Sequence, residues 1–320
     1  MTSSRLLDWS SAQQQICALI AAHRSQMKIV LKTKDDIFFL PRWVEHHRKI
    51  VGEKSLVIFD NGSTNPAVLD FYAQLDPRIT VARFSGFHNN IHNVAIFPAL
   101  YAAIRGSCDY YSFLDTDEYL THWLDGRIRT QAELLTALPE SGSTILPGMW
   151  LYNYPGSTTL FQIDRRGNSI SNGVLWGKPI IGASLEIDGF INHNCQCPRA
   201  LFSRLKYEGA FIILHLAKLS TAQRIQANLN KLQARRFDIS KIELNRAYLD
   251  STSFADQNIR LYLEEILHLR ASEEYRPPQT NGLLVNTVQL NDSGELLFHT
   301  PEDKAWFEAA LTHLEDALPA

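Results

Sequence analysis

Four short apolar segments, separated by helix-like stretches, constrain the fold of this chain most strongly. Each has the length and the β-branched or aromatic content of a buried strand, and they span residues 27–32, 55–59, 78–84 and 110–114. Amphipathic helical patterns precede and separate them, at residues 12–26, 37–52, 67–75 and 93–105. Mostly apolar strands that alternate with helices predict an α/β fold, with a mostly parallel sheet flanked by helices.

The last of these strands ends at a tight cluster of acidic residues: Asp115, Asp117 and Glu118 lie within four positions. Carboxylates this close repel one another, so the turn loses stability unless a cation compensates. Mg²⁺ and Mn²⁺ suit carboxylate oxygen, and Mg²⁺ often binds one or two carboxylates together with substrate phosphates. An Asp-x-Asp at a strand end is therefore a candidate site for a metal-bound diphosphate. A solvated acidic turn is the alternative for this motif taken alone.

Composition narrows the class of protein. A net charge of −3 over 320 residues gives no reason to expect a nucleic-acid partner. We expect no signal peptide and no membrane span, since no apolar run approaches roughly 18–20 residues. We interpret the cysteines as reduced thiols of a cytoplasmic protein, because the clustered pair lacks the usual zinc spacing; they are Cys17, Cys108, Cys195 and Cys197.

Five motifs follow one another along the first two thirds of the chain: Lys32-x-Lys34-Asp35-Asp36, Trp43-x-x-His46-His47, Phe59-Asp60-Asn61-Gly62-Ser63-Thr64, Asn93-x-Ala95 and Phe113-Leu114-Asp115-Thr116-Asp117-Glu118-Tyr119-Leu120. In this order they resemble the glycosyltransferase-2-like enzymes of GT-A fold, and more closely the branch related to glycosyltransferase family 92. The resemblance covers residues 28–218. Two positions depart from the family pattern: Asn65 replaces a common Asp, and Tyr119 a common Phe.

The resemblance implies a GT-A (Rossmann-like) catalytic domain that transfers a sugar from a nucleotide-diphosphate donor to a glycan or glycolipid acceptor. It favours a UDP-sugar as the donor and inversion as the stereochemical course. It places the donor against residues at strand ends and in two neighbouring segments, which are Thr33, Asp35, Asp36, Asp60, Asn61, Asn93, Asp115 and Lys178. Simpler structural roles stay open for several of them. Asp60 also fits an Asx turn, and one of Asp35 and Asp36 also fits a helix cap.

The resemblance also implies a Mn²⁺ or Mg²⁺ cofactor bound by Asp115, Asp117 and a late histidine, His215. That ion would act as a Lewis acid on the departing nucleoside diphosphate. His215 follows an apolar run and precedes Lys218 and a Ser that opens a helix. A buried structural histidine is the alternative, and Lys218 fits either a phosphate contact or a solvated position. His46 and His47 fit packing better than ligation.

Acceptor and base are less well defined by the sequence. The aromatic and Gly-rich stretch 147–157 resembles a family loop that shapes the acceptor cleft, with Trp150 and Tyr152 as candidates to stack on sugar rings. An inverting transfer needs a general base near the acceptor hydroxyl. Asp188 and Glu186 lie in the expected region, and the rivals are His193 and Glu208.

We expect three parts: an N-terminal helix (1–27), the catalytic domain (28–218) and a largely helical C-terminal extension (219–320). The extension shows helical patterns at 221–236, 241–248 and 258–270, a hairpin pattern in 282–298 and a last helix from Pro301. Its basic residues fit a solvated face or peripheral contact with the inner face of an anionic membrane.

Two other functions compete with sugar transfer. A nucleotidyltransferase also places metal carboxylates at strand ends, but it would want a Gly-rich basic loop after the first strand, and residues 33–36 contain no glycine. A non-catalytic carbohydrate-binding protein on the same fold is the second. The intact Asp115, Asp117 and His215 argue against it.

Overall fold

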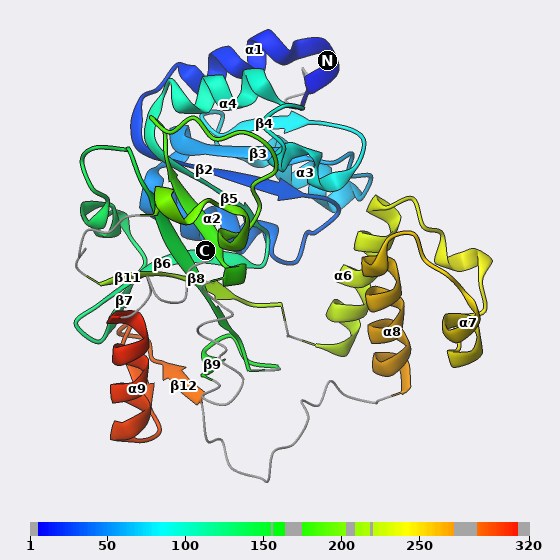
Figure 1. The fold of residues 1–320 in the computed structure, drawn as a ribbon. Coiled ribbons are helices and arrows are strands. Elements are labelled where there is room, and N and C mark those ends of the chain that lie inside the picture. The colour runs from blue at the N-terminus through cyan, green and yellow to red at the C-terminus, as the bar shows by residue number, and fades with distance from the viewer. Residues whose placement is uncertain are drawn as a thin grey trace.

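The computed structural model describes residues 6–154, 156–163, 175–202, 209–217, 220–271 and 287–312, and a ten-stranded mixed sheet forms its core (Figure 1). In spatial order the strands are β1 (Leu7–Asp8), β4 (Thr80–Arg83), β3 (Leu56–Asp60), β2 (Ser25–Thr33), β5 (Cys108–Asp115), β10 (Lys178–Gly182), β8 (Ile145–Tyr152), β11 (Ala210–His215), β6 (Glu118–Leu124) and β7 (Arg127–Arg129). The first five run parallel, and β10 joins β5 antiparallel. The predicted α/β class is confirmed.

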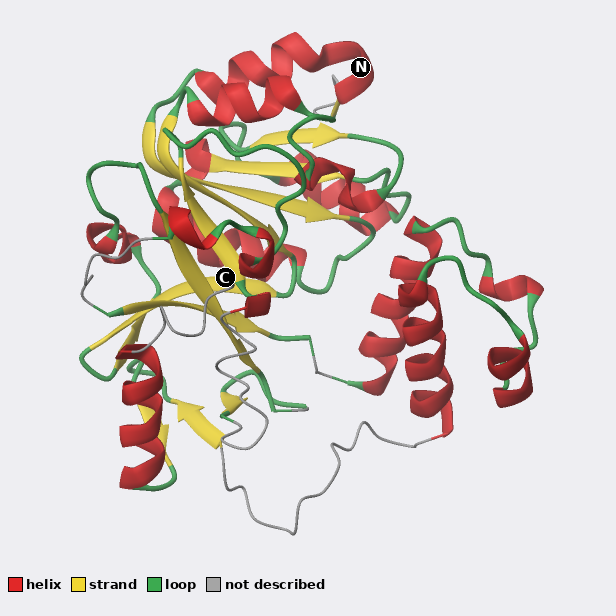
Figure 2. Cartoon of the chain, in the orientation of Figure 1, coloured by secondary structure: helices red, strands yellow, loops and turns green. Residues whose placement is uncertain are grey.

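Helices cover both faces of the parallel half (Figure 2). One face packs against α1 (Trp9–Ala21) and α4 (Pro98–Arg105), and the other against α2 (Leu40–Val51) and α3 (Pro66–Gln74). Strand β2 shows why both faces are apolar: Val30 packs into the first cluster, and its neighbours Ile29 and Leu31 pack into the second. Alternate residues of a strand point to opposite faces, so a strand buried on both sides reads as a continuous apolar run.

Two smaller units follow the sheet along the chain. Helices α6 (Thr221–Ala234), α7 (Arg246–Ser251) and α8 (Gln257–Ala271) enclose their own apolar cluster and form what we call the helical lobe. A three-stranded sheet contains β9 (Leu160–Gln162), β12 (Thr287–Leu290) and β13 (Leu296–Phe298), next to α9 (Pro301–Thr312). The predicted hairpin is thus present in its described part, with a turn at Asn291–Gly294. Short 3₁₀ helices are η1 (Glu53–Ser55), η2 (His88–His92), η3 (Ala132–Ala137), η4 (Asn194–Gln196), η5 (Arg199–Leu201) and η6 (Ile239–Lys241).

Three element boundaries differ from the sequence-based expectations. The first helix ends at Ala21 because Ser25 already pairs with β5. The helix expected over 93–105 starts only at Pro98, since a residue before proline disfavours helical dihedrals. The aromatic stretch from Pro147 is strand β8 up to Tyr152, not a loop. Its Gly148 lies so close to β10 that an added Cβ would be 2.5 Å from the Lys178 carbonyl oxygen.

Within the described ranges, no helix is long and apolar enough to span a bilayer, and all four cysteines are free thiols. The two adjacent histidines of α2 have packing roles. The His46 Nε2 donates to the Leu120 carbonyl (2.7 Å), and the His47 Nε2 accepts from the Leu120 amide (3.1 Å). Burial lowers the pKa of His46 to about 4 and that of His47 well below its usual value, so both rings are neutral. They fix the start of β6, directly after the acidic turn.

Candidate active site

The acidic turn between β5 and β6 lies at the carboxyl edge of the parallel strands, and its first carboxylate is compensated by two lysines. The Asp115 carboxylate lies 3.1 Å from the Lys32 Nζ and 3.0 Å from the Lys178 Nζ. Both ammonium groups are buried. Burial alone would raise the pKa of Asp115, but Lys178 and Lys32 outweigh it and hold that pKa well below its usual value. Asp115 is therefore ionised and held within the protein.

Lys32 also ties this carboxylate to the segment after β4. Its Nζ donates to the Asn89 side-chain oxygen (2.9 Å) and lies 3.1 Å from the His92 Nε2. Burial and the neighbouring Lys32 charge keep the pKa of His92 well below its usual value, so its ring is neutral and its Nε2 accepts a hydrogen bond from Lys32. Sequence reasoning assigned no site role to Lys32 or Asn89. The signal that points to Lys32 is a charged residue within the apolar run of β2.

Glu118 links the acidic turn to the Trp150 side chain. One carboxylate oxygen accepts from the Asp115 amide and the other from the Trp150 Nε1, each at 2.8 Å, and the Lys178 Nζ lies 3.6 Å away. The side chain is fully buried, and this burial raises its pKa. Glu118 thus fixes the turn backbone and the Trp150 indole at the same time, a positioning role that the sequence did not indicate.

The second aspartate of the motif meets the late histidine. Asp117 Oδ2 lies 3.4 Å from His215 Nε2, although the two residues are 98 positions apart in the sequence (215 − 117). Strand pairing explains the meeting: His215 is the last residue of β11, and it pairs with Glu118 on one side and with Tyr152 on the other. Burial works to raise the pKa of Asp117, but His215 lowers it to about 2.

The residues present fit a divalent cation in part. A carboxylate and a neutral imidazole are suitable ligands for Mn²⁺, and substrate phosphates and water commonly complete such sites. Among the described residues, no three His, Cys, Asp or Glu side chains converge on one metal position. The structure brings Asp117 and His215 together, and Asp115 faces ammonium groups instead. Lys218 lies outside the described residues.

The His215 ring stands in an aromatic wall. Its centroid is 4.7 Å from that of Trp150 and 5.1 Å from that of Tyr152. Next to Trp150 is His193, at 5.1 Å, and the exposed Trp176 lies 5.8 Å beyond it. These rings present flat apolar faces beside the Asp117–His215 pair, as a sugar-binding surface requires.

His193, one of the rival bases, is connected to the acidic turn by hydrogen bonds. The Lys178 Nζ donates to the Asn192 side-chain oxygen (2.7 Å), and the Asn192 side-chain nitrogen lies 3.0 Å from the His193 Nε2. Burial and the Lys178 charge lower the pKa of His193 to about 3. Asp188 and Glu186, by contrast, are exposed and make no hydrogen bond or ion pair with the described residues. Glu208 lies outside the described residues.

Asp60 is fully buried at the end of β3. Its carboxylate accepts from the Ser63 amide (2.8 Å), the Ser63 hydroxyl and the Tyr72 hydroxyl (3.1 Å), and Arg83 Nε lies 3.7 Å away. These contacts hold the polar turn that follows β3, as an Asx turn does.

The two acids after β2 hold neighbouring loops. The Asp35 carboxylate accepts from the amides of Thr64 (2.7 Å) and Asn65 (2.8 Å), and Asp35 adopts a left-handed φ of 51°. The Asp36 carboxylate accepts from the Thr116 hydroxyl (2.5 Å), and Thr116 is the residue between the two aspartates of the acidic turn. Burial raises the pKa of Asp36. Both acids therefore shape the edge of the site.

The remaining predicted donor residues lie along the same edge. The Thr33 hydroxyl is buried without a hydrogen-bond partner among the described residues. The Asn61 side-chain nitrogen lies 3.4 Å from the His88 Nδ1, and the Asn93 side-chain oxygen accepts from the Ala95 backbone amide (3.0 Å) in an Asx turn. Thr33 is thus the group of this set with an open hydrogen-bonding capacity.

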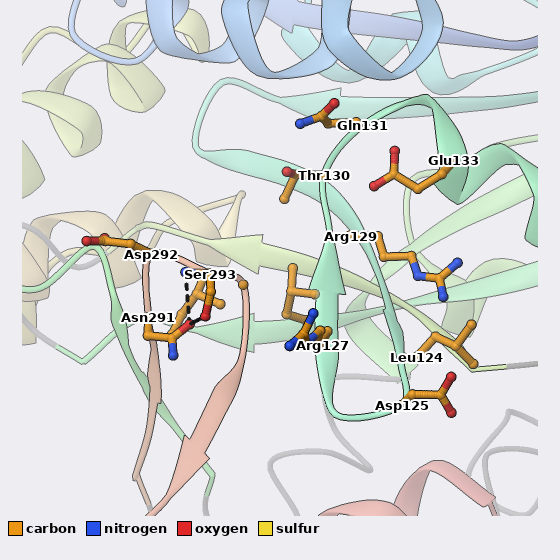
Figure 3. Close-up of a pocket in the computed structure, with 13 residues that line it drawn as sticks. Leu124, Asp125, Arg127, Arg129, Thr130, Gln131, Glu133, Asn291, Asp292 and Ser293 are labelled. Atoms are coloured by element: carbon orange, nitrogen blue, oxygen red, sulfur yellow. Dashed lines mark hydrogen bonds between the residues drawn. The ribbon is translucent and has the colours of Figure 1, made fainter.

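A separate hollow of about 750 Å³ lies at the other end of β6, between the β6–β7 and β12–β13 turns (Figure 3). Arg127, on its wall, pairs with Glu295 at 3.0 Å, and Asn291 holds the opposite turn through the Ser293 amide (3.1 Å). The lining residues do not include the acids, lysines or aromatics of the acidic turn.

Comparisons with known proteins identify no family. No family model matches the sequence, and no curated protein matches it. Residues 1–349 of TarS from S. aureus align at 12% identity, over 92% of this chain and 81% of that one, with a TM-score of 0.31. A longer TarS structure aligns at 12% identity over 92% of this chain and 49% of that one, with a TM-score of 0.32.

A further similar structure is the mannosyltransferase PcManGT from Pyrobaculum calidifontis, in complex with GDP-Man and Mn²⁺. It aligns at 10% identity over 78% of this chain and 71% of that one, with a TM-score of 0.32. Because the identities and TM-scores are this low, these similarities assign no function to this chain. What the fold and site define is a class: an α/β protein with a partly buried, lysine-compensated acidic turn at the carboxyl edge of its sheet.

Proposed function

We propose that the chain is a metal-dependent GT-A glycosyltransferase, which moves a sugar from a nucleoside-diphosphate donor to a glycan or glycolipid acceptor. A UDP-sugar is the leading candidate for the donor, and the transfer inverts the configuration of the sugar. The observation that carries this proposal is the Asp117–His215 pair, 3.4 Å apart, at the sheet edge where α/β folds bind ligands. An aromatic wall stands directly beside it. An acid–imidazole pair can hold a cation beside a phosphate, and flat aromatic faces can stack on a sugar ring. A sugar phosphate is a ligand that would use both features at once.

The Asp117 carboxylate and the His215 imidazole would hold Mn²⁺ or Mg²⁺, and the bound ion would neutralise charge on the departing nucleoside diphosphate. Asp115, kept ionised and oriented by Lys32 and Lys178, is free to accept from donor hydroxyls at its exposed side. The Thr33 hydroxyl is buried and has no hydrogen-bond partner among the described residues, so it would reach the nucleotide only after a local rearrangement. Donor contacts by Asp35, Asp36, Asp60, Asn61 and Asn93 are proposed as indirect, through the loops that these side chains hold.

On the acceptor side, Trp150 and Tyr152 stack on the apolar face of a sugar ring, with Glu118 holding the Trp150 indole in place. The general base comes from the loop after β10. Asp188 and Glu186 are the carboxylates on that loop, and they would need the loop to bring them to the acceptor. His193 is already at the aromatic wall and is the alternative base. We propose a cytoplasmic location, with the acceptor at the inner membrane face.

A nucleotide-sugar screen tests this function. We expect UDP-sugars, or another nucleotide sugar of the panel, to raise the melting temperature of the protein only when Mn²⁺ or Mg²⁺ is present, because a ligand that binds the folded state stabilises it by mass action. Thermal shift with and without chelator is the measurement. If no nucleotide sugar shifts the melting temperature under either condition, the glycosyltransferase proposal is wrong.

A further inference from the structure

The helical lobe lies beside the carboxyl edge of the parallel strands, where β2, β3 and β4 end (Figure 1). Arg235, the first residue after α6, shows this placement. Its guanidinium carbon is 5.7 Å from the centroid of the Phe87 ring, just before η2, and 5.0 Å from that of Tyr262 on α8. Arg235 also pairs with Asp256 at 2.9 Å. The lobe therefore packs against the same segment that Lys32 holds from the other side.

Lys231 lies one helical turn before Arg235, on the same side of α6, because residues four apart share a helix face. Its Nζ is 5.5 Å from the Tyr262 ring centroid. Burial and Arg224 lower the pKa of Lys231, whereas Asp117 and Asp115 act in the opposite direction. Lys231 thus lies on the face of α6 that meets the segment from Phe87 to His92, and this segment borders Asp115 through Asn89 and Lys32.

Two neighbouring cations, Arg224 and Arg235, already form ion pairs. Arg224 makes a two-point pair with Glu265 at 2.7 and 2.9 Å, and Arg235 pairs with Asp256. Among the described residues, Lys231 has no carboxylate within ion-pair distance. Arg224 and Arg235 thus turn toward α8 and the loop before it, whereas Arg236 and Lys241 of the same lobe are exposed.

We propose that Lys231 binds the diphosphate of the donor, so that the helical lobe completes the donor site; this rests on the proposed glycosyltransferase function. A diphosphate between Asp117 and Lys231 would meet the metal-binding pair on one side and a half-buried ammonium on the other. Lysine binds phosphate as a compact point charge on a flexible stem, which suits a position opposite a rigid turn. The tyrosine ring beneath the stem orients the ammonium without neutralising it.

The test is calorimetric titration of the full chain with UDP and, separately, GDP, in the presence of Mn²⁺. Lys231→Met keeps the stem and removes the charge, and we expect it to weaken nucleoside-diphosphate binding about 10- to 100-fold, the loss typical of a hydrogen bond to a charged group. Lys231→Arg keeps the charge and should stay within about threefold of wild type. The matched control is Lys241→Met, on the same lobe but with a side chain 79% exposed, and it should bind as wild type does.

The outcomes separate the two proposals. If wild type binds UDP or GDP and Lys231→Met binds it equally well, the Lys231 proposal is wrong and the transferase proposal stands. An Arg variant as weak as the Met variant, with both folded by circular dichroism, would also overturn it, since the charge would not be the property that matters. If wild type binds neither nucleotide, both proposals fail.

Discussion

Asp117→Asn should lower turnover of the donor found in the screen by about 100-fold or more, because it removes the negative charge that Asp117 contributes to the Asp117–His215 pair. The protein should remain folded but be somewhat less stable at neutral pH, because an ionised carboxylate whose pKa is held below its unfolded value stabilises the folded state. Because His215 holds the pKa of Asp117 near 2, the carboxylate is ionised throughout the neutral range, and its loss matters at every working pH. Release of nucleoside diphosphate at saturating Mn²⁺ is the measurement.

Asp292→Asn is the matched control, an exposed aspartate in the turn between β12 and β13. It should leave turnover unchanged. Wild-type turnover in Asp117→Asn at saturating metal would exclude Asp117 as a ligand. Loss of folded protein in Asp117→Asn would instead assign it a structural role.

Lys178→Met should destabilise the protein by about 3 kcal/mol at neutral pH, because it leaves the Asp115 and Glu118 carboxylates without the buried cation they share. The deficit should shrink on acidification. Asp115 has a folded-state pKa below its unfolded value of 3.8, so its stabilising contribution is present above that pH and is lost as pH falls through the folded pKa. Wild type loses this contribution in acid, whereas the variant has less of it to lose.

Urea unfolding at pH 7 and near pH 3, below the unfolded pKa of Asp115, measures both effects. The control is Lys304→Met, an exposed lysine of α9 that pairs with Glu308 one turn later, at 3.8 Å. We expect it to cost little at either pH, as surface pairs do. A Lys178→Met variant as stable as wild type at pH 7 would contradict the central role of Lys178 in holding the turn.

The parallel half of the fold was predictable because its strands are buried on both faces and therefore read as apolar runs such as 55–59 and 110–114. Strand order was not. Lys32 compensates Asp115 because β2 pairs with β5 in a register that places these two residues opposite each other, and no local pattern encodes that register. The expectation of a cation at the acidic turn was physically sound, yet lysines supply part of that charge.

For His215, too, the sequence predicted the residue but not its contacts. The sequence picked out His215 by its place after an apolar run, but its contact with Asp117 depends on β11 lying between β8 and β6. The base was harder still, because Asp188, Glu186 and His193 share one irregular loop and only tertiary structure separates the exposed acids from the ring at the aromatic wall. Lys231 carried no signal beyond a basic helix. Its orientation follows from packing of the helical lobe.

The coupling between metal and nucleotide tests the central claim most directly. Titrating wild type with UDP and with GDP, each in Mn²⁺ and in chelator, gives that coupling as a ratio of affinities. If Asp117, His215 and the donor diphosphate share one cation, at least one nucleotide should bind about tenfold or more tightly with Mn²⁺, and by linkage that nucleotide should tighten Mn²⁺ binding by the same factor. Equal affinities with and without Mn²⁺, or binding of neither nucleotide, would contradict the account.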